Sequence, residues 1–121
     1  MSNDSVSKPA TASYLTEHSG LREFQNFHKW LDQEKKFTPD MFINIAFLTE
    51  ELGEVVKATR IFQKADTSEL MERARGQIGE ELADCLAYIL KLANYSDIDL
   101  YKAYVNKMKQ NMHRTWHQQT D

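Results

Sequence analysis

Four segments of the chain carry apolar residues at the spacing of an amphipathic helix, and no segment shows the strict alternation of a half-buried strand. The pattern predicts helices over residues 21–34, 39–63, 69–94 and 100–114. In the first segment the apolar positions share one face, which is formed by Leu21, Phe24, Phe27, Trp30 and Leu31. With only four glycines and two prolines among 121 residues, we expect an all-α fold built as a four-helix bundle.

The second segment is apolar around most of its circumference. Its large apolar residues include Phe42, Ile43, Ile45, Phe47, Leu48, Val55, Val56, Ile61 and Phe62. They cannot all face one small core, and a helix that is apolar on every side must be covered on every side. Because apolar surface left over from a core is typical of a partner interface, we expect a homo-oligomer.

Polar residues before the segments predict helix caps. The candidates are Thr38 for the second helix, Asp66 or Ser68 for the third, and Asp99 for the fourth. Gly76 and Gly79 weaken the start of the third segment, so a bend or a break is expected there.

The composition bounds the class of protein. A formal net charge of −3 gives no reason to expect a nucleic acid partner, and no apolar stretch is long enough and free enough of charge to span a bilayer. The lone Cys85 lies in an apolar run, which predicts a reduced core residue in a cytoplasmic protein. We expect an N-terminal arm over residues 1–17, one helical domain over 18–116 and a polar tail over 117–121.

An acidic motif interrupts the apolar second segment. Glu51 shares a helical stripe with Phe47, Leu48, Val55, Ala58 and Phe62. Glu54 lies one turn further along, with Glu50 at the edge of the pair. A carboxylate in an apolar setting is costly unless it is paired or binds a metal ion. A solvated acidic face is the ordinary explanation of such a run, but the apolar stripe around Glu51 argues against it.

A second acidic motif repeats this spacing in the third segment, where Glu81 and Asp84 open the apolar run that contains Cys85. If the two helices bring their motifs to one face, four oxygen-bearing side chains meet. Oxygen ligands suit hard cations, and magnesium is usually held by a few carboxylates together with water and phosphate oxygens. The two motifs therefore predict a magnesium site.

The fourth segment carries a different signal. Lys107, Asn111 and Arg114 follow at i, i+4 and i+7 and share one face of a helix. Two cations beside an amide suit a phosphorylated ligand. The alternative is that Lys107 and Arg114 simply favour the negative end of the helix dipole, and the sequence leaves both open.

Taken together, these motifs resemble the pattern of the MazG-like all-α nucleoside triphosphate pyrophosphohydrolases, a group that includes dCTP pyrophosphatase-like and integron-associated enzymes. The pattern is ExxE, then ExxD, then KxxxNxxR. It reads here as Glu51-Leu52-Gly53-Glu54, Glu81-Leu82-Ala83-Asp84, and Lys107, Asn111 and Arg114. The resemblance covers about residues 21–116. It implies the all-α fold of that group, assembled as a dimer of dimers or, as second choice, a dimer.

The resemblance also implies an activity and a set of roles. By this resemblance, the protein would hydrolyse (deoxy)nucleoside triphosphates to the monophosphate and pyrophosphate, in nucleotide-pool sanitation. Mg²⁺, for which Mn²⁺ could substitute, would be held by Glu51, Glu54, Glu81 and Asp84. The substrate would be contacted by Tyr88, Lys107, Asn111 and Arg114, and in a looser alignment by Phe27, His28 and Trp30. On chemical grounds, Glu54 or Glu50 accepts the proton of the attacking water.

Other classes fit the residues less well. A di-iron oxidoreductase bundle needs Glu-x-x-His pairs, and the chain has none. His113 and His117 are spaced as zinc ligands can be, but surface histidines are the simpler interpretation. A non-catalytic helical module for nucleotide binding or protein interaction is the alternative function. It would not need the four acids together with Lys107, Asn111 and Arg114.

Overall fold

The computed structural model describes residues 15–114, and this part of the chain is entirely helical, without strands. Its helices are α1 (Leu21–Lys35), α2 (Met41–Lys64), α3 (Ser68–Tyr95) and α4 (Leu100–Met112). The predicted all-α class and all four helices are confirmed. Most of the expected N-terminal arm, residues 1–17, and all of the expected tail, residues 117–121, lie outside the described residues.

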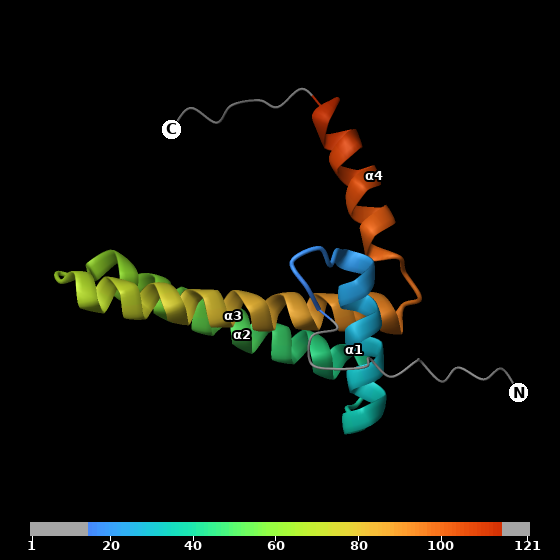
Figure 1. The fold of residues 1–121 in the computed structure, drawn as a ribbon, viewed down its shortest axis with the longest axis horizontal. Coiled ribbons are helices and arrows are strands. Elements are labelled where there is room, and N and C mark those ends of the chain that lie inside the picture. The colour runs from blue at the N-terminus through green and yellow to red at the C-terminus, as the bar shows by residue number, and fades with distance from the viewer. Residues whose placement is uncertain (1–14, 115–121) are drawn as a thin grey trace, which may run out of the picture.

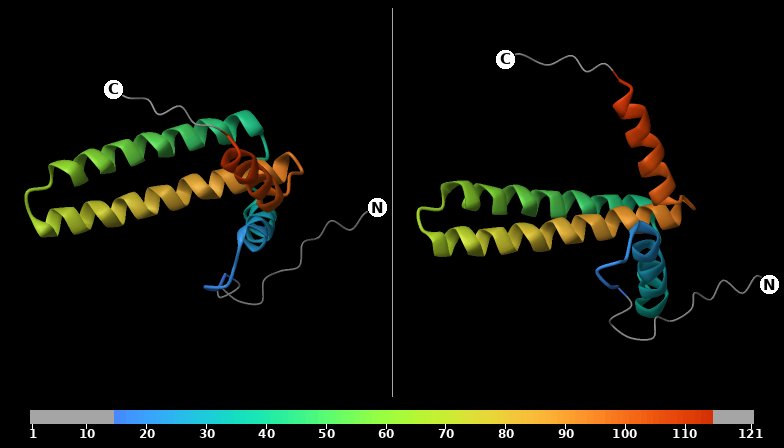
Figure 2. Two further views of the ribbon diagram at one scale, coloured as in Figure 1. Left: turned by 90° about the horizontal axis from the view of Figure 1, so that it is seen from above. Right: turned by 45° about the horizontal axis from the view of Figure 1, so that its top comes forward.

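The two long helices form an antiparallel hairpin, and the two shorter helices gather at its open end. In Figure 1 α2 and α3 run side by side, and α1 crosses them where α2 begins and α3 ends. Figure 2 shows α4 leaving the end of α3 and pointing away from the hairpin. Within the described residues, α4 packs mainly against α1. One chain therefore does not wrap its four helices into a closed bundle.

The interface between the helices is built largely from small side chains. Ala58 of α2 and four residues of α3 are buried: Ala74, Cys85, Leu90 and Ala93. Small residues let two helix backbones approach closely, which suits a long, narrow hairpin. Cys85 is a free, buried thiol as the sequence predicts, and burial raises its pKa.

Much of the apolar surface of the hairpin remains exposed. On α2, Phe42 is 84% exposed and Val56 is 53% exposed, and on α3 Leu82 is 52% exposed. Leu86 and Ile89 of α3 are exposed as well, although the sequence pattern gives them one face with the buried Cys85. The prediction that one chain cannot cover α2 is confirmed.

Three local predictions were wrong. Asp40, not Thr38, caps α2, because its Oδ1 accepts the Ile43 amide at 2.9 Å. The cap of α3 is Thr67, whose extended backbone lets Oγ1 accept the Leu70 amide at 3.1 Å, so Ser68 becomes the first helical residue. The expected bend at Gly76 and Gly79 is absent, because α3 continues through both glycines without interruption. The Asp99 cap of α4 is confirmed.

A buried glutamine fixes the direction in which α4 leaves the fold. Gln25 of α1 donates from Nε2 to the Asn94 side chain and to the Ile98 carbonyl, at 3.0 and 2.8 Å. Its Oε1 accepts the amide of Leu100, the first residue of α4, at 2.8 Å. Arg22 adds an ion pair with Asp99 at 3.0 Å. The turn between α3 and α4 is thus held by α1.

None of the helices in the described part of the chain is both long and apolar enough to cross a lipid bilayer.

Candidate active site

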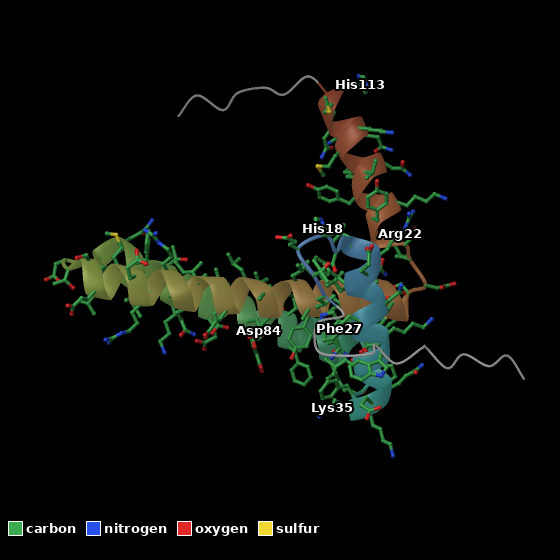
Figure 3. All side chains as sticks on the ribbon, viewed as in Figure 1. His18, Arg22, Phe27, Lys35, Asp84 and His113 are labelled. Atoms are coloured by element: carbon green, nitrogen blue, oxygen red, sulfur yellow. The ribbon has the colours of Figure 1, made fainter. Side chains whose placement is uncertain are left out.

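Three carboxylates meet where α2 and α3 run side by side. Glu51 comes from α2, and Glu81 and Asp84 come from α3. One carboxylate oxygen of each lies within 4.8 Å of the others. Figure 3 shows Asp84 along the hairpin, between the closed end and the crossing of α1. The antiparallel pairing of two helices with matched acidic spacing produces this cluster, as the sequence predicts for these three residues.

The cluster holds negative charge without a compensating cation. A hydrogen bond with Glu81, partial burial and the charges of Glu81, Asp84 and Glu54 raise the pKa of Glu51 to about 7. Within residues 15–114, none of the three clustered carboxylates forms an ion pair with a lysine, arginine or histidine. Gln77 steadies the arrangement by donating from Nε2 to Glu81 Oε1 at 2.6 Å. Like charges held together in this way favour either a shared proton or a bound cation.

The donor set fits a hard divalent cation. Magnesium binds oxygen at about 2.0–2.1 Å in octahedral geometry, so ligands on opposite sides of the ion are about 4.2 Å apart. The three oxygens already lie within 4.8 Å of one another. The three carboxylates would therefore be the residues to hold such an ion, which would keep further positions for water or phosphate oxygens.

Two other predicted acids lie beside the cluster. Glu54 is close enough to raise the pKa of Glu51, but it does not join the three-oxygen group. Glu50 is exposed and contributes to the raised pKa of the Tyr88 hydroxyl, after burial and the charges of Glu51 and Asp84. Both acids therefore border the cluster without belonging to it.

A cavity of about 370 Å³ opens from the cluster toward α1. It is lined by Glu51 and Asp84 at one end, and further along by His28, Leu31, Asp32, Phe37, Ala87, Tyr88 and Lys91. Tyr88 lies one helical turn beyond Asp84, as the resemblance implies for a residue near the substrate. The Phe47 ring supports the Tyr88 ring from α2, with the ring centroids 5.8 Å apart.

The far wall of this cavity contains a buried ion pair. Lys91 Nζ lies 3.4 Å from Asp32 Oδ1, and both side chains are almost fully buried. The Tyr95 hydroxyl donates a hydrogen bond to the other oxygen of Asp32. Burial and this contact raise the pKa of Tyr95, so the hydroxyl keeps its proton. No motif in the sequence marks Asp32. The sequence shows Asp32 only as an acid on the half-buried side of α1. Its pairing with Lys91 depends on the crossing of α1 over α3.

His28 borders the same cavity, whereas Trp30 packs elsewhere. Burial lowers the pKa of His28, and the opposing effect of Asp32 is smaller, so the imidazole favours its neutral form. Trp30 is half-buried against Phe27, with ring centroids 6.0 Å apart, and it is not among the described residues that line the cavity. The structure thus places His28, rather than Trp30, beside the candidate site of its own chain.

The residues of the third motif lie away from the carboxylates. Lys107 and Arg114 are exposed and Asn111 is half-buried, all on or just beyond α4. Figure 3 shows His113 at the far end of that helix, well separated from Asp84. Within one chain the structure does not bring these residues to the acidic cluster.

The crowding of Glu51 predicts a pH dependence for the metal-free protein. Its pKa rises on folding from 4.5 to about 7, so the folded state holds an extra proton between these values. The resulting stabilisation is complete below about pH 4.5 and is lost as the pH rises through 7. We expect the melting temperature in a chelator to fall across this window more steeply for the wild type than for Glu51→Gln. If the melting temperatures of the two proteins fell equally with pH, the raised pKa would not belong to Glu51.

The comparisons with known proteins agree with the geometry. A family model described as "MazG nucleotide pyrophosphohydrolase domain" matches residues 42–117, which is more than half of the chain. The comparison with curated proteins gives no match. The matched stretch contains the three clustered carboxylates, Tyr88 and Lys91. It begins after α1, so the positions of His28 and Asp32 rest on the structure alone.

Proposed function

Since the chain belongs to the MazG nucleotide pyrophosphohydrolase family, we propose that it hydrolyses (deoxy)nucleoside triphosphates to the monophosphate and pyrophosphate. The observation that carries this proposal is the meeting of Glu51, Glu81 and Asp84 within 4.8 Å of one another. Water attacks the phosphoryl group, the bond between the α- and β-phosphates breaks, and pyrophosphate leaves. Such a reaction needs positioning and charge neutralisation more than covalent help.

Mg²⁺, or Mn²⁺ in its place, would be held by Glu51, Glu81 and Asp84, with Glu54 beside them. A divalent ion supplies charge neutralisation at phosphoryl oxygens and lowers the pKa of coordinated water. The chain's part is to hold the carboxylates in place, and Gln77 serves this through its hydrogen bond to Glu81. Glu50 and Glu54, which border the cluster, are the candidates to accept the proton of the attacking water.

The cavity beside the cluster suits the nucleoside part of the substrate. Tyr88 and Phe37 offer aromatic faces, and the neutral His28 adds a polar edge. The expected substrate contact of Trp30 has no support within one chain, so such a contact would have to be made to a neighbour's site. Phosphates bound at the carboxylate end would leave the sugar and base to extend toward α1.

In a homo-oligomer, residues of a neighbouring chain would complete this site. Lys107, Asn111 and Arg114 are carried away from the cluster by α4, so they would contact phosphates and sugar in the site of another chain. The exposed apolar residues of α2 and α3 supply the surface for such an assembly. A dimer of dimers buries more of this surface than a simple dimer, and is therefore the proposed state. Nucleotide-pool sanitation in the cytoplasm is the proposed setting.

A turnover screen tests the activity directly. The purified protein is given each standard and damaged nucleoside triphosphate with Mg²⁺, and the products are separated and identified. We expect equal amounts of monophosphate and pyrophosphate, no orthophosphate, and complete loss of turnover in a chelator. Binding of a non-hydrolysable nucleotide in calorimetry without turnover of any triphosphate would instead support a non-catalytic nucleotide-binding module.

A further inference from the structure

We infer that the buried pair of Lys91 and Asp32 selects the base of the nucleotide, with Lys91 donating a hydrogen bond to an exocyclic carbonyl oxygen. This inference rests on the proposed function, because it assigns the substrate class of the same site. The substrates favoured in this way carry cytosine, uracil, thymine or guanine, and adenine, whose exocyclic group is an amine, is disfavoured.

The first argument is the state of the Lys91 ammonium group. Lys91 is only 8% exposed, yet it lines the cavity. Its Nζ is 3.4 Å from Asp32 Oδ1, and within residues 15–114 it makes no shorter polar contact. An ammonium group carries three donors. The contact with Asp32 is longer than an ordinary hydrogen bond, and Asp32 Oδ1 is a buried oxygen without a hydrogen-bond partner in the described part of the chain. The ammonium therefore keeps a donor for an acceptor that enters the cavity.

The second argument excludes the phosphates as that acceptor. Lys91 lies seven residues beyond Asp84 on α3, which is roughly 10 Å along the helix axis. A phosphate that shared a metal ion with Asp84 would lie at the carboxylate end of the cavity, two helical turns of α3 from Lys91. The charge of Lys91 is also already balanced by Asp32, whereas a phosphate site needs an excess of positive charge.

The third argument is the shape of the surrounding wall. The Lys91 ammonium lies 4.6 Å from the centroid of the Phe37 ring and 5.2 Å from that of Tyr88. The ammonium thus lies over the faces of both rings in cation–π contacts, which hold it at the aromatic wall of the cavity. A base that enters between the carboxylates and α1 therefore meets a wall made of Phe37, Tyr88 and the Lys91 donor.

Asp32 holds the Lys91 ammonium group in position. One of its oxygens accepts the Tyr95 hydroxyl and the other faces Lys91, so the carboxylate ties α1 to α3 and fixes the ammonium. An amino group at the carbonyl position places two donors against each other. Sites built around a hydrogen bond reject analogues that cannot form it by large factors, and we expect at least about a tenfold preference for carbonyl-bearing bases.

Lys91→Met tests the inference through the ratio between bases. We measure kcat/KM for dCTP, dUTP, dGTP and dATP, and inhibition by inorganic tripolyphosphate, which has no base. The expected result is a loss of about tenfold or more for the three carbonyl-bearing substrates. The kcat/KM for dATP and the inhibition constant of tripolyphosphate should each change by less than about twofold. Equal losses on all four nucleotides, or weaker inhibition by tripolyphosphate, would overturn the inference.

Two further variants guard against a folding artefact. Removing Lys91 leaves the buried charge of Asp32 without its cation, which destabilises the fold. The double variant Lys91→Met/Asp32→Asn removes both charges. Its ratio of kcat/KM for the carbonyl-bearing substrates to kcat/KM for dATP should match that of the single variant. Lys64→Met, at the closed end of the hairpin, is the matched control and should keep the wild-type ratio. Thermal melting shows which variants are folded at the assay temperature.

A failure of the proposed hydrolase activity can be distinguished from a failure of base selection. If the wild type turns over none of the four nucleotides, the activity is wrong. Selectivity is then read from the binding of non-hydrolysable analogues by calorimetry. A carbonyl preference that disappears in Lys91→Met would uphold base selection in a binding protein. Equal affinity of the wild type for all four analogues would refute it.

Discussion

Glu51→Gln and Asp84→Asn are each expected to reduce hydrolysis by about a thousandfold or more, while the fold survives. A thousandfold loss corresponds to about 4 kcal/mol of transition-state stabilisation. Each substitution removes one carboxylate from the cluster that would hold the metal ion. The side chains keep their size, so the packing of α2 against α3 is preserved.

The stability of these variants should move in the opposite direction. The pKa of Glu51 is raised by its hydrogen bond with Glu81, by burial and by the charges of Glu81, Asp84 and Glu54. Removing one charge from the metal-free cluster relieves the last of these effects. We therefore expect equal or higher melting temperatures in a chelator. We also expect Mg²⁺ to raise the melting temperature of the wild type but not that of the variants.

Glu72→Gln is the matched control. Glu72 is an exposed acid on α3 that pairs with Arg75 at 3.2 Å, away from the cluster. Exposed ion pairs of this kind contribute little to the stability of the fold. Turnover and the response to Mg²⁺ should therefore stay at the wild-type level. Turnover like that of the wild type in Glu51→Gln or Asp84→Asn would show that the site has been misassigned.

The second large effect concerns assembly. Val56→Glu and Leu52→Glu each place a charge on the exposed apolar side of α2, one turn apart. In an oligomer that covers this side, a buried unpaired charge costs several kcal/mol. We expect both variants to dissociate toward the chain mass of 14.1 kDa. They should lose activity as well, because Lys107, Asn111 and Arg114 would no longer reach a neighbouring site.

Light scattering together with activity decides this prediction. Lys35→Gln changes an exposed residue at the end of α1 and should leave both mass and turnover unchanged. Circular dichroism separates dissociation from unfolding. Fully active wild-type protein with the mass of one chain would refute the assembly and, with it, the role proposed for α4.

The sequence alone predicted the helices and most of the acidic site. Helical periodicity is a local property, so the bounds of α1 to α4 came out within a few residues. The caps of α2 and α3 were missed because neighbouring polar residues compete for the same amides, and backbone geometry decides between Thr38 and Asp40. Glu51, Glu81 and Asp84 were predictable because equal spacing on two helices presents the carboxylates along one face of each.

The tertiary structure alone decided how α1 and α4 relate to the hairpin. No local pattern pairs Asp32 with Lys91 across 59 positions, since the crossing of α1 over α3 creates that contact. The same holds for Gln25, which reaches the start of α4 and turns that helix away from the carboxylates. Spacing within a helix fixes which side chains share a face, whereas packing between helices fixes which faces meet. The sequence by itself therefore determined which acidic face each long helix carries, and only the fold determined the wall of the adjoining cavity.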